Sequence, residues 1–125
     1  MIGLTIAKLL KESGNLLALV STDNIFPYVA NENTQLPLII YTVDSINPEY
    51  TKDGWCGDLI NFSVISFSED YAGLQAISTE VRKALEMQYD TDTQRIYVTG
   101  MTEGFNISEN IFLNKLTFKI EVNKY

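Results

Sequence analysis

The sequence contains no histidine and only one cysteine, Cys56, and these two scarcities exclude most of the common catalytic chemistries. Without histidine the chain lacks the usual general base and the partner that activates a nucleophilic thiol. Zinc sites that combine cysteine with histidine ligands are excluded for the same reason. A single cysteine can form no disulfide within the chain, which agrees with a reducing compartment. We therefore expect a protein with no catalytic activity, no cofactor and no bound metal.

Basic side chains are also scarce. Nine Lys and Arg stand against sixteen Asp and Glu, which gives a net charge of −7. Because affinity for phosphates comes mainly from clustered Lys and Arg, this balance argues against a DNA- or RNA-binding surface. It does not exclude DNA that passes close by without binding. An acidic surface that keeps the protein soluble is the simpler interpretation.

Long apolar runs are absent as well. No run approaches the roughly 18 residues that a membrane-spanning helix needs, and the N-terminus lacks the pattern of a secretory signal peptide. We therefore expect a protein that is made and kept in the cytosol and does not enter a membrane. At 125 residues, 46% of them hydrophobic, the chain fits one ordered domain over residues 1–125.

Carboxylates occur in pairs, but none of the pairs has the context of a known site. Glu69 with Asp70 stands at an expected helix start, and Asp53 with Asp58 stands in a polar connector. The run DTDTQ at residues 90–94 suggests calcium, yet it lacks the glycine and the terminal glutamate of an EF-hand loop. We interpret these groups as a helix N-terminus, a solvated loop and a helix-ending turn.

Two stretches have the 3.6-residue periodicity of amphipathic helices. Residues 2–13 place apolar side chains at three- and four-residue steps with two lysines outside, and residues 16–20 can add one more turn. Residues 68–88 form the clearest helix, with Ser68 as the expected N-cap. Its apolar stripe consists of Tyr71, Leu74, Ile77, Val81, Ala84 and Leu85.

Four stretches have strand character: residues 36–45, 58–68, 95–105 and 115–125. Residues 21–35 are polar and contain Pro27, so they read as a connection, which the apolar side chains of Ile25, Phe26, Tyr28 and Val29 attach to the core. The order is therefore α-β-β-α-β-β. It predicts an α+β fold with a mostly antiparallel sheet of four or slightly more strands, covered on one face by the N-terminal helix and the longer helix.

The connector between the first two expected strands, Ile46–Asp58, is longer than reversal of the chain requires. It holds Trp55, the only tryptophan of the chain, and Tyr50. Such a tryptophan either folds back onto its own sheet or serves as an anchor for a partner, since Trp and Tyr are enriched at interfaces. The sequence leaves both readings open.

Several short segments, taken in order, resemble the tail-completion or tail-terminator proteins of long-tailed bacteriophages. In the order of the chain they are Ile25-Phe26-Pro27, Leu36-Pro37, Val43, Asp53-Gly54, Asp70-Tyr71, Val81-Arg82 and Ala84-Leu85. The likeness covers most of the chain. The segment TEGFNISENIF, residues 102–112, does not contribute to it.

This resemblance implies a non-enzymatic protein that assembles as a ring, with six copies expected, on the head-proximal end of the tail tube. Its implied partners are other copies of the chain, the tail-tube protein and a head-closure or connector protein, while DNA passes through the ring without specific binding. The implied location is the host cytoplasm during assembly and then the junction of tail and head in the virion. Candidate residues for the contact with a neighbouring subunit or the tube are Tyr50, Lys52, Asp53, Trp55 and Asp58.

One other class of protein fits the same residues. A cytosolic α+β domain that dimerises through its sheet and binds a small ligand or regulates a partner would have similar composition and periodicity. It should have a concave apolar pocket with a few convergent polar groups.

Overall fold

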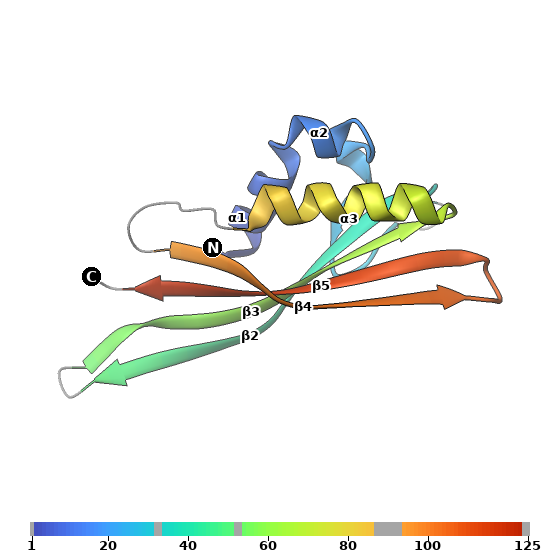
Figure 1. Ribbon diagram of the computed structural model, residues 1–125. Helices are drawn as coiled ribbons and strands as arrows, with labels where there is room; N and C mark the ends of the chain where they lie inside the picture. Colours follow the sequence, from blue (N-terminus) through green and yellow to red (C-terminus); the bar gives the residue numbers. More distant parts are fainter. Residues whose placement is uncertain (1, 32–33, 52–53, 87–93, 124–125) are drawn as a thin grey trace.

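The computed structural model describes residues 2–31, 34–51, 54–86 and 94–123. These residues form a mixed α+β fold with three α-helices and a five-stranded sheet (Figure 1). The helices are α1 (Ile2–Lys11), α2 (Gly14–Leu17) and α3 (Tyr71–Leu85), and a short 3-10 turn, η1, spans Thr22–Asn24. The strands are β1 (Ile25–Pro27), β2 (Leu38–Thr51), β3 (Gly54–Ser68), β4 (Gln94–Asn106) and β5 (Ile111–Asn123).

The strands lie in the order β1-β2-β3-β5-β4. Strand β1 pairs with β2 in parallel, whereas all the other neighbouring strands are antiparallel. The sheet is mostly antiparallel, as expected, but the predicted order of elements lacked one strand, β1, which adds the one parallel pair among the described strands. This strand escaped prediction because it is only three residues long and ends at Pro27 inside a polar stretch.

The three helices cover one face of the middle of the sheet (Figure 1). Between the two layers lies the core, in which the rings of Phe62 on β3 and Phe118 on β5 stack with centroids 4.9 Å apart. The alternation predicted for the last strand is confirmed at Leu116, Phe118 and Ile120, which are all buried. No helix in the described part of the chain is long and apolar enough to cross a bilayer.

Helix α3 has the predicted apolar stripe with two changes. Leu74, Ile77, Val81 and Leu85 are buried, but Ser78 joins them, while Ala84 is only half-buried and Tyr71 is 49% exposed. The predicted N-cap, Ser68, was wrong. The cap is Asp70, whose Oδ2 accepts a hydrogen bond from the backbone N–H of Gly73 at 3.0 Å, because the helix begins at Tyr71 and the capping residue directly precedes it.

The N-terminal segment forms two short helices, α1 and α2, in agreement with the predicted helix and its further turn, although α2 begins two residues earlier than expected. Ile6 and Leu10 of α1 are fully buried, as predicted, and Leu16 of α2 joins them. Ser13 caps the start of α2, since its hydroxyl accepts a hydrogen bond from the backbone N–H of Leu16 at 3.3 Å. A side-chain acceptor at this position allows a second helix to begin two residues after the first one ends.

The connection over residues 21–35 is only partly attached to the core by its apolar side chains. Ile25 is buried, but Tyr28 and Val29 are 59% and 74% exposed, so the prediction that both face the core was wrong. Tyr28 has a positive φ of 62°, which turns the chain out of β1. Its hydroxyl accepts a hydrogen bond from the backbone N–H of Val43 at 3.3 Å, and lies 3.4 Å from the carbonyl of the same residue, to which it can donate.

The prediction of a polar loop at Ile46–Asp58 was also wrong. Residues up to Thr51 belong to β2 and residues from Gly54 belong to β3, so most of the supposed connector is the outer half of one long β-hairpin. Asn, Pro and Gly are rare in strands, which is why the composition predicted a loop. The ladder between β2 and β3 continues through these residues, and its register shifts twice, between Val43 and Ser45 and between Glu49 and Tyr50.

Candidate functional site

The β2–β3 hairpin extends past the helices at one end of the sheet (Figure 1). We call its outer half, from Ile46 to Thr51 and from Gly54 to Ile60, the β2–β3 arm. Because the arm lies beyond α3, the face that is covered elsewhere is open here, and Ile46 is 53% exposed although it pairs with buried Ile60. A hairpin that leaves its own core in this way has surface available for another molecule.

The candidate contact residues that the sequence predicted lie on this arm as far as the structure describes them. Tyr50 is 70% exposed. It lies directly opposite Trp55 in the register of the hairpin, near its end. Asp58 is half-buried and lies opposite Pro48. Lys52 and Asp53 fall outside the described residues.

A second arm, formed by β4 and β5, extends at the opposite end of the sheet (Figure 1). We call residues 101–113 the β4–β5 arm. The sequence predicted a strand to residue 105 and a break before the next strand at residue 115. Strand β4 ends at Asn106, close to that expectation, but β5 begins already at Ile111, so only residues 107–110 form the turn. Asn106 stabilises that turn, since its Oδ1 accepts a hydrogen bond from the backbone of Glu109 at 3.2 Å, and Asn110 adopts a positive φ of 59°.

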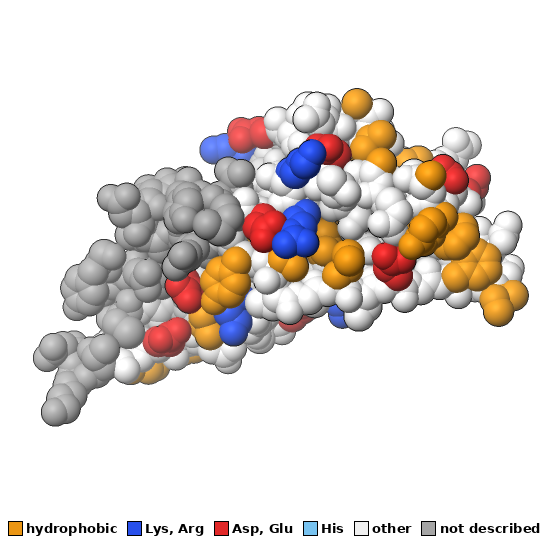
Figure 2. All heavy atoms as spheres, in the orientation of Figure 1, with side chains coloured by type: hydrophobic (Ala, Val, Ile, Leu, Met, Phe, Trp, Pro, Cys, Tyr) orange, Lys and Arg blue, Asp and Glu red, His pale blue; other side chains and the backbone are white. Residues whose placement is uncertain are grey.

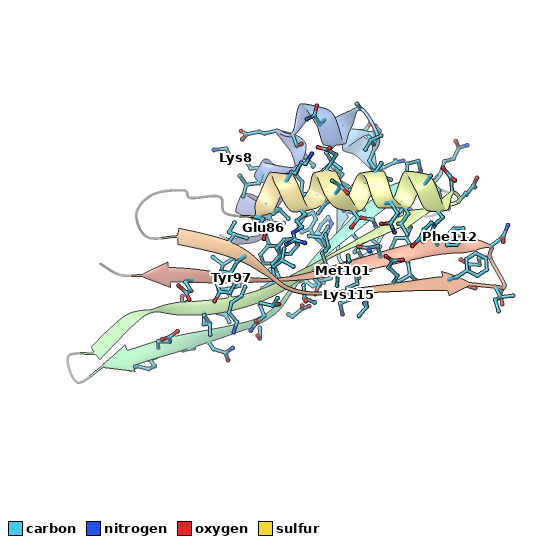
Figure 3. The ribbon with its side chains drawn as sticks, in the orientation of Figure 1. Lys8, Glu86, Tyr97, Met101, Phe112 and Lys115 are labelled. Atoms are coloured by element: carbon cyan, nitrogen blue, oxygen red, sulfur yellow. The ribbon has the colours of Figure 1, made fainter. Side chains whose placement is uncertain are left out.

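The β4–β5 arm exposes apolar side chains that sequence analysis did not select. Met101, Phe105 and Ile107 are 54%, 44% and 85% exposed. Figure 2 shows hydrophobic side chains gathered at this end of the molecule, on the right of the view, and Figure 3 labels Met101 and Phe112 on the two strands. The strand itself was predicted through residue 105, but its apolar side chains were not expected to stay exposed.

Aromatic contacts join this arm to the start of α3. The ring of Phe112 lies 4.6 Å from the ring of Phe105 and 5.5 Å from that of Tyr71, measured between centroids. The Tyr71 hydroxyl donates a hydrogen bond to a carboxylate oxygen of Glu103 at 2.9 Å, and the amide of Gln75 donates to the other oxygen at 3.1 Å. The hydrogen bond to Glu103, together with its negative charge, raises the pKa of the Tyr71 phenol. These contacts hold the base of the arm against the helix layer.

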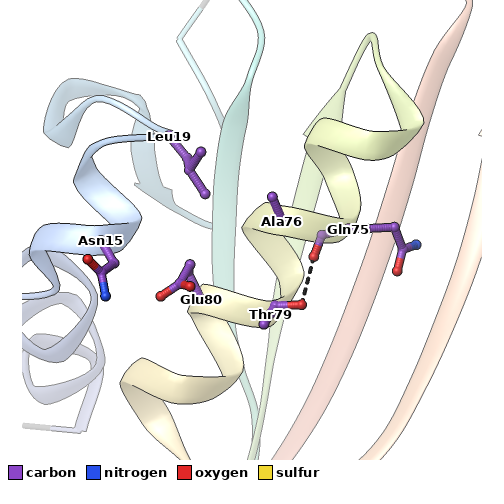
Figure 4. A pocket seen from close by; sticks show the side chains of 6 residues that line it. All are labelled: Asn15, Leu19, Gln75, Ala76, Thr79 and Glu80. Carbon is purple, nitrogen blue, oxygen red and sulfur yellow. Dashed lines mark hydrogen bonds between the residues drawn. The ribbon is translucent and has the colours of Figure 1, made fainter.

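A groove of about 620 Å³ lies between α2 and α3 (Figure 4). Its lining residues are Asn15, Leu19, Gln75, Ala76, Thr79 and Glu80. The groove opens widely to solvent, and most of these side chains are polar. It is therefore unlike the enclosed apolar pocket that a small-ligand domain would need.

Two acidic side chains have clear structural partners. Asp70 caps α3, and the carboxylate of Asp44 accepts a short hydrogen bond from the hydroxyl of Ser63. Within the described ranges no three His, Cys, Asp or Glu side chains come together in a way that could hold a metal ion. The run at residues 90–94 lies largely outside the described residues.

Comparison with known proteins gives a match at the level of the fold. Neither a protein-family model nor a curated protein sequence matches the chain. Among solved structures, one similar chain belongs to the virion of a native gene transfer agent particle, with a TM-score of 0.80 and 14% sequence identity. The match covers 94% of this chain and 91% of that one. At this identity the comparison shows a shared fold.

Proposed function

We propose that this protein is a structural component of a phage-like particle that caps the head-proximal end of the tail tube as a ring. In this role it ends polymerisation of the tube and presents a surface to the head-closure protein. The observation that carries the proposal is a fold match along almost the whole chain to a component of a gene transfer agent virion. The ordered resemblance of its short sequence segments to tail-terminator proteins supports the more specific role.

The shape of the subunit suits such a ring. Two arms extend from opposite ends of the sheet (Figure 1), and both expose large apolar side chains, Ile46 and Tyr50 on one and Met101, Phe105 and Ile107 on the other. In the proposed ring, which has six copies as in the family that the sequence resembles, the β2–β3 arm contacts the neighbouring subunit or the tail tube through Tyr50 and Trp55, with Lys52, Asp53 and Asp58 nearby. The ring forms in the host cytoplasm and stays at the junction of tail and head.

The net charge of −7 is consistent with DNA passing through the ring. Since like charge opposes contact with phosphates, an acidic channel would let DNA slide without adhering. We expect the purified protein to show no retention of double-stranded DNA at 50 mM salt, where electrostatic binding is strong. Tight, salt-sensitive binding would contradict this part of the proposal.

The direct test is a tube-growth assay. A tail-tube protein from the same phage-like particle would be polymerised alone and with increasing amounts of this protein, and tube lengths would be measured by electron microscopy. We expect shorter tubes with a density cap at one end, because a bound ring blocks addition of further subunits. Unchanged tube lengths and uncapped ends at saturating protein would overturn the proposal.

A further inference from the structure

The exposed large apolar side chains of the described chain collect along the two lateral edges of the sheet. On one side they are Met101, Phe105 and Ile107, which we call the β4-edge patch. On the other side they are Tyr28, Val29, Ile46 and Tyr50, which we call the β1–β2-edge patch. The two others, Leu19 and Tyr71, lie in the helix layer.

Both patches lie beside strand edges that lack a neighbour in the described part of the chain. Strand β4 is the last strand on its side and pairs with β5 from Gln94 to Asn106, with one irregularity between Val98 and Gly100. No proline interrupts it, although proline and lysine are common protections of such an edge. Apart from the irregularity at Val98/Gly100, β4 is a long edge strand with exposed apolar side chains beside it, and such an edge is a template for pairing with another chain.

The opposite edge is shorter and partly closed. Strand β1 pairs with β2 over three residues. Beyond it, the hydroxyl of Tyr28 hydrogen-bonds with the backbone N–H and carbonyl of Val43, so these groups are not available to another strand. Farther along, Pro48 has no N–H to donate. Backbone pairing on this side is therefore restricted to β1 and a short part of β2, and contact here would depend more on the apolar side chains.

The strand directions make the two edges compatible. Strands β2 and β3, β3 and β5, and β5 and β4 are each antiparallel, so β4 runs opposite to β2 and to β1, which is parallel to β2. Two copies that stand side by side in the same orientation would therefore bring β4 of one against β1 and β2 of the other in antiparallel fashion. Antiparallel pairing gives the more stable ladder.

We infer that the β4-edge patch of one subunit docks on the β1–β2-edge patch of a second copy of this chain. This inference rests on the proposed function, since it names the contact that would close the ring. The two patches are different surfaces, so the contact is heterologous and each subunit keeps one free edge for the next neighbour until the ring closes. A two-fold contact between two β4 strands would instead bury one patch and leave the other in water.

Two double variants test this contact without disturbing the core. Met101→Lys with Ile107→Lys places two charges on the β4-edge patch, and Val29→Lys with Ile46→Lys places two on the opposite patch. All four side chains are more than half exposed. Thr79→Lys, on the exposed side of α3, is the control for added charge. Near-identical thermal unfolding of the isolated subunits would show that each variant folds.

The readout is solution mass by light scattering, alone and with tail-tube protein present. We expect the wild type and the control to form a ring in at least one of these conditions, and each double variant to fail. An equimolar mixture of the two double variants should form a 1:1 dimer, because each supplies the edge that the other lacks.

Self-association of either double variant alone, or a mixture that stays monomeric, would overturn the inference, as would a wild type that is monomeric throughout. A ring that leaves tube growth unchanged would instead contradict the tube-capping role and leave this contact standing.

Discussion

At the scale of single residues, a polar pair is buried between α3 and the sheet. The Ser78 hydroxyl donates a hydrogen bond to Oδ1 of Asn114 at 3.0 Å, and the two residues are 7% and 1% exposed. The Nδ2 group of Asn114 is buried without a hydrogen-bond partner. The bond from Ser78 is therefore the one side-chain hydrogen bond that compensates for burying the amide of Asn114. If it is lost, the desolvation free energy of the buried amide is no longer offset.

We therefore predict that Ser78→Ala destabilises the protein by about 1–3 kcal/mol. The double variant Ser78→Ala with Asn114→Leu should recover much of this loss, since it removes both polar partners together. Urea unfolding of the two single variants and the double variant would give the coupling between them. Strictly additive effects would mean that this hydrogen bond contributes nothing.

Asp70 provides a second prediction at this scale. Replacing it with alanine removes the acceptor for the backbone N–H of Gly73, and loss of such a cap costs about 1 kcal/mol. Asp70→Asn should retain stability, because asparagine caps equally well. Glu69→Ala, at an exposed position that does not cap the helix, is the matched control. Equal thermal unfolding of the alanine variants at positions 69 and 70 would contradict the assigned cap.

At the scale of secondary-structure elements, the two arms differ in how their ends are turned. The β2–β3 arm passes through Gly54, which has a φ of +110°, whereas the β4–β5 arm turns through Asn110 at a φ of 59°. A φ of 59° lies in the left-handed region that asparagine tolerates, but +110° is accessible almost only to glycine. The first arm therefore depends on a glycine at its tip.

We predict that Gly54→Ala loosens the β2–β3 arm at a cost of about 1–3 kcal/mol, the usual range for a strained backbone position. Gly14→Ala is the control, because Gly14 starts α2 and an added Cβ there meets no atom within 4 Å. In Gly54→Ala the backbone amides of residues 46–51 should exchange faster than in the wild type. In Gly14→Ala their exchange rates should be unchanged. Unchanged exchange in the arm would contradict a role for Gly54 in holding it.

The same elements show what a sequence can reveal. The stripe of α3 and the alternation of β5 were predictable because each buries one regular face, and burial produces a periodic pattern. The β2–β3 arm was not, because it extends past the helices and its Asn, Pro and Gly residues suggest a loop, whereas β4 of the other arm was predicted as a strand to residue 105. The candidate residues at Tyr50 and Trp55 were found through their residue type alone. The β4-edge patch was missed because Met101 and Phe105 look like ordinary strand residues and Ile107 stands in a polar turn.

At the scale of the whole molecule, Trp55 tests the role of the β2–β3 arm in assembly. We predict that Trp55→Ala leaves the unfolding temperature of the isolated subunit nearly unchanged. It should raise the protein concentration needed for half-maximal ring formation at least tenfold, since aromatic side chains dominate interface energetics. Light scattering over a dilution series gives the second quantity. A large fall in unfolding temperature would favour the other reading, in which Trp55 packs on its own sheet. Leu19→Ala, an exposed apolar change in the helix layer, is the control.

The strand order has one further consequence, for the way the chain folds. β2 with β3 and β4 with β5 are hairpins between consecutive strands, whereas the antiparallel seam between β3 and β5 joins strands separated by α3 and β4. Local hairpins close quickly, while a contact between distant segments must first overcome the entropy of a long loop. Folding should therefore be limited by the moment at which α3 brings the two hairpins together, and the stacked rings of Phe62 and Phe118 lie on that seam.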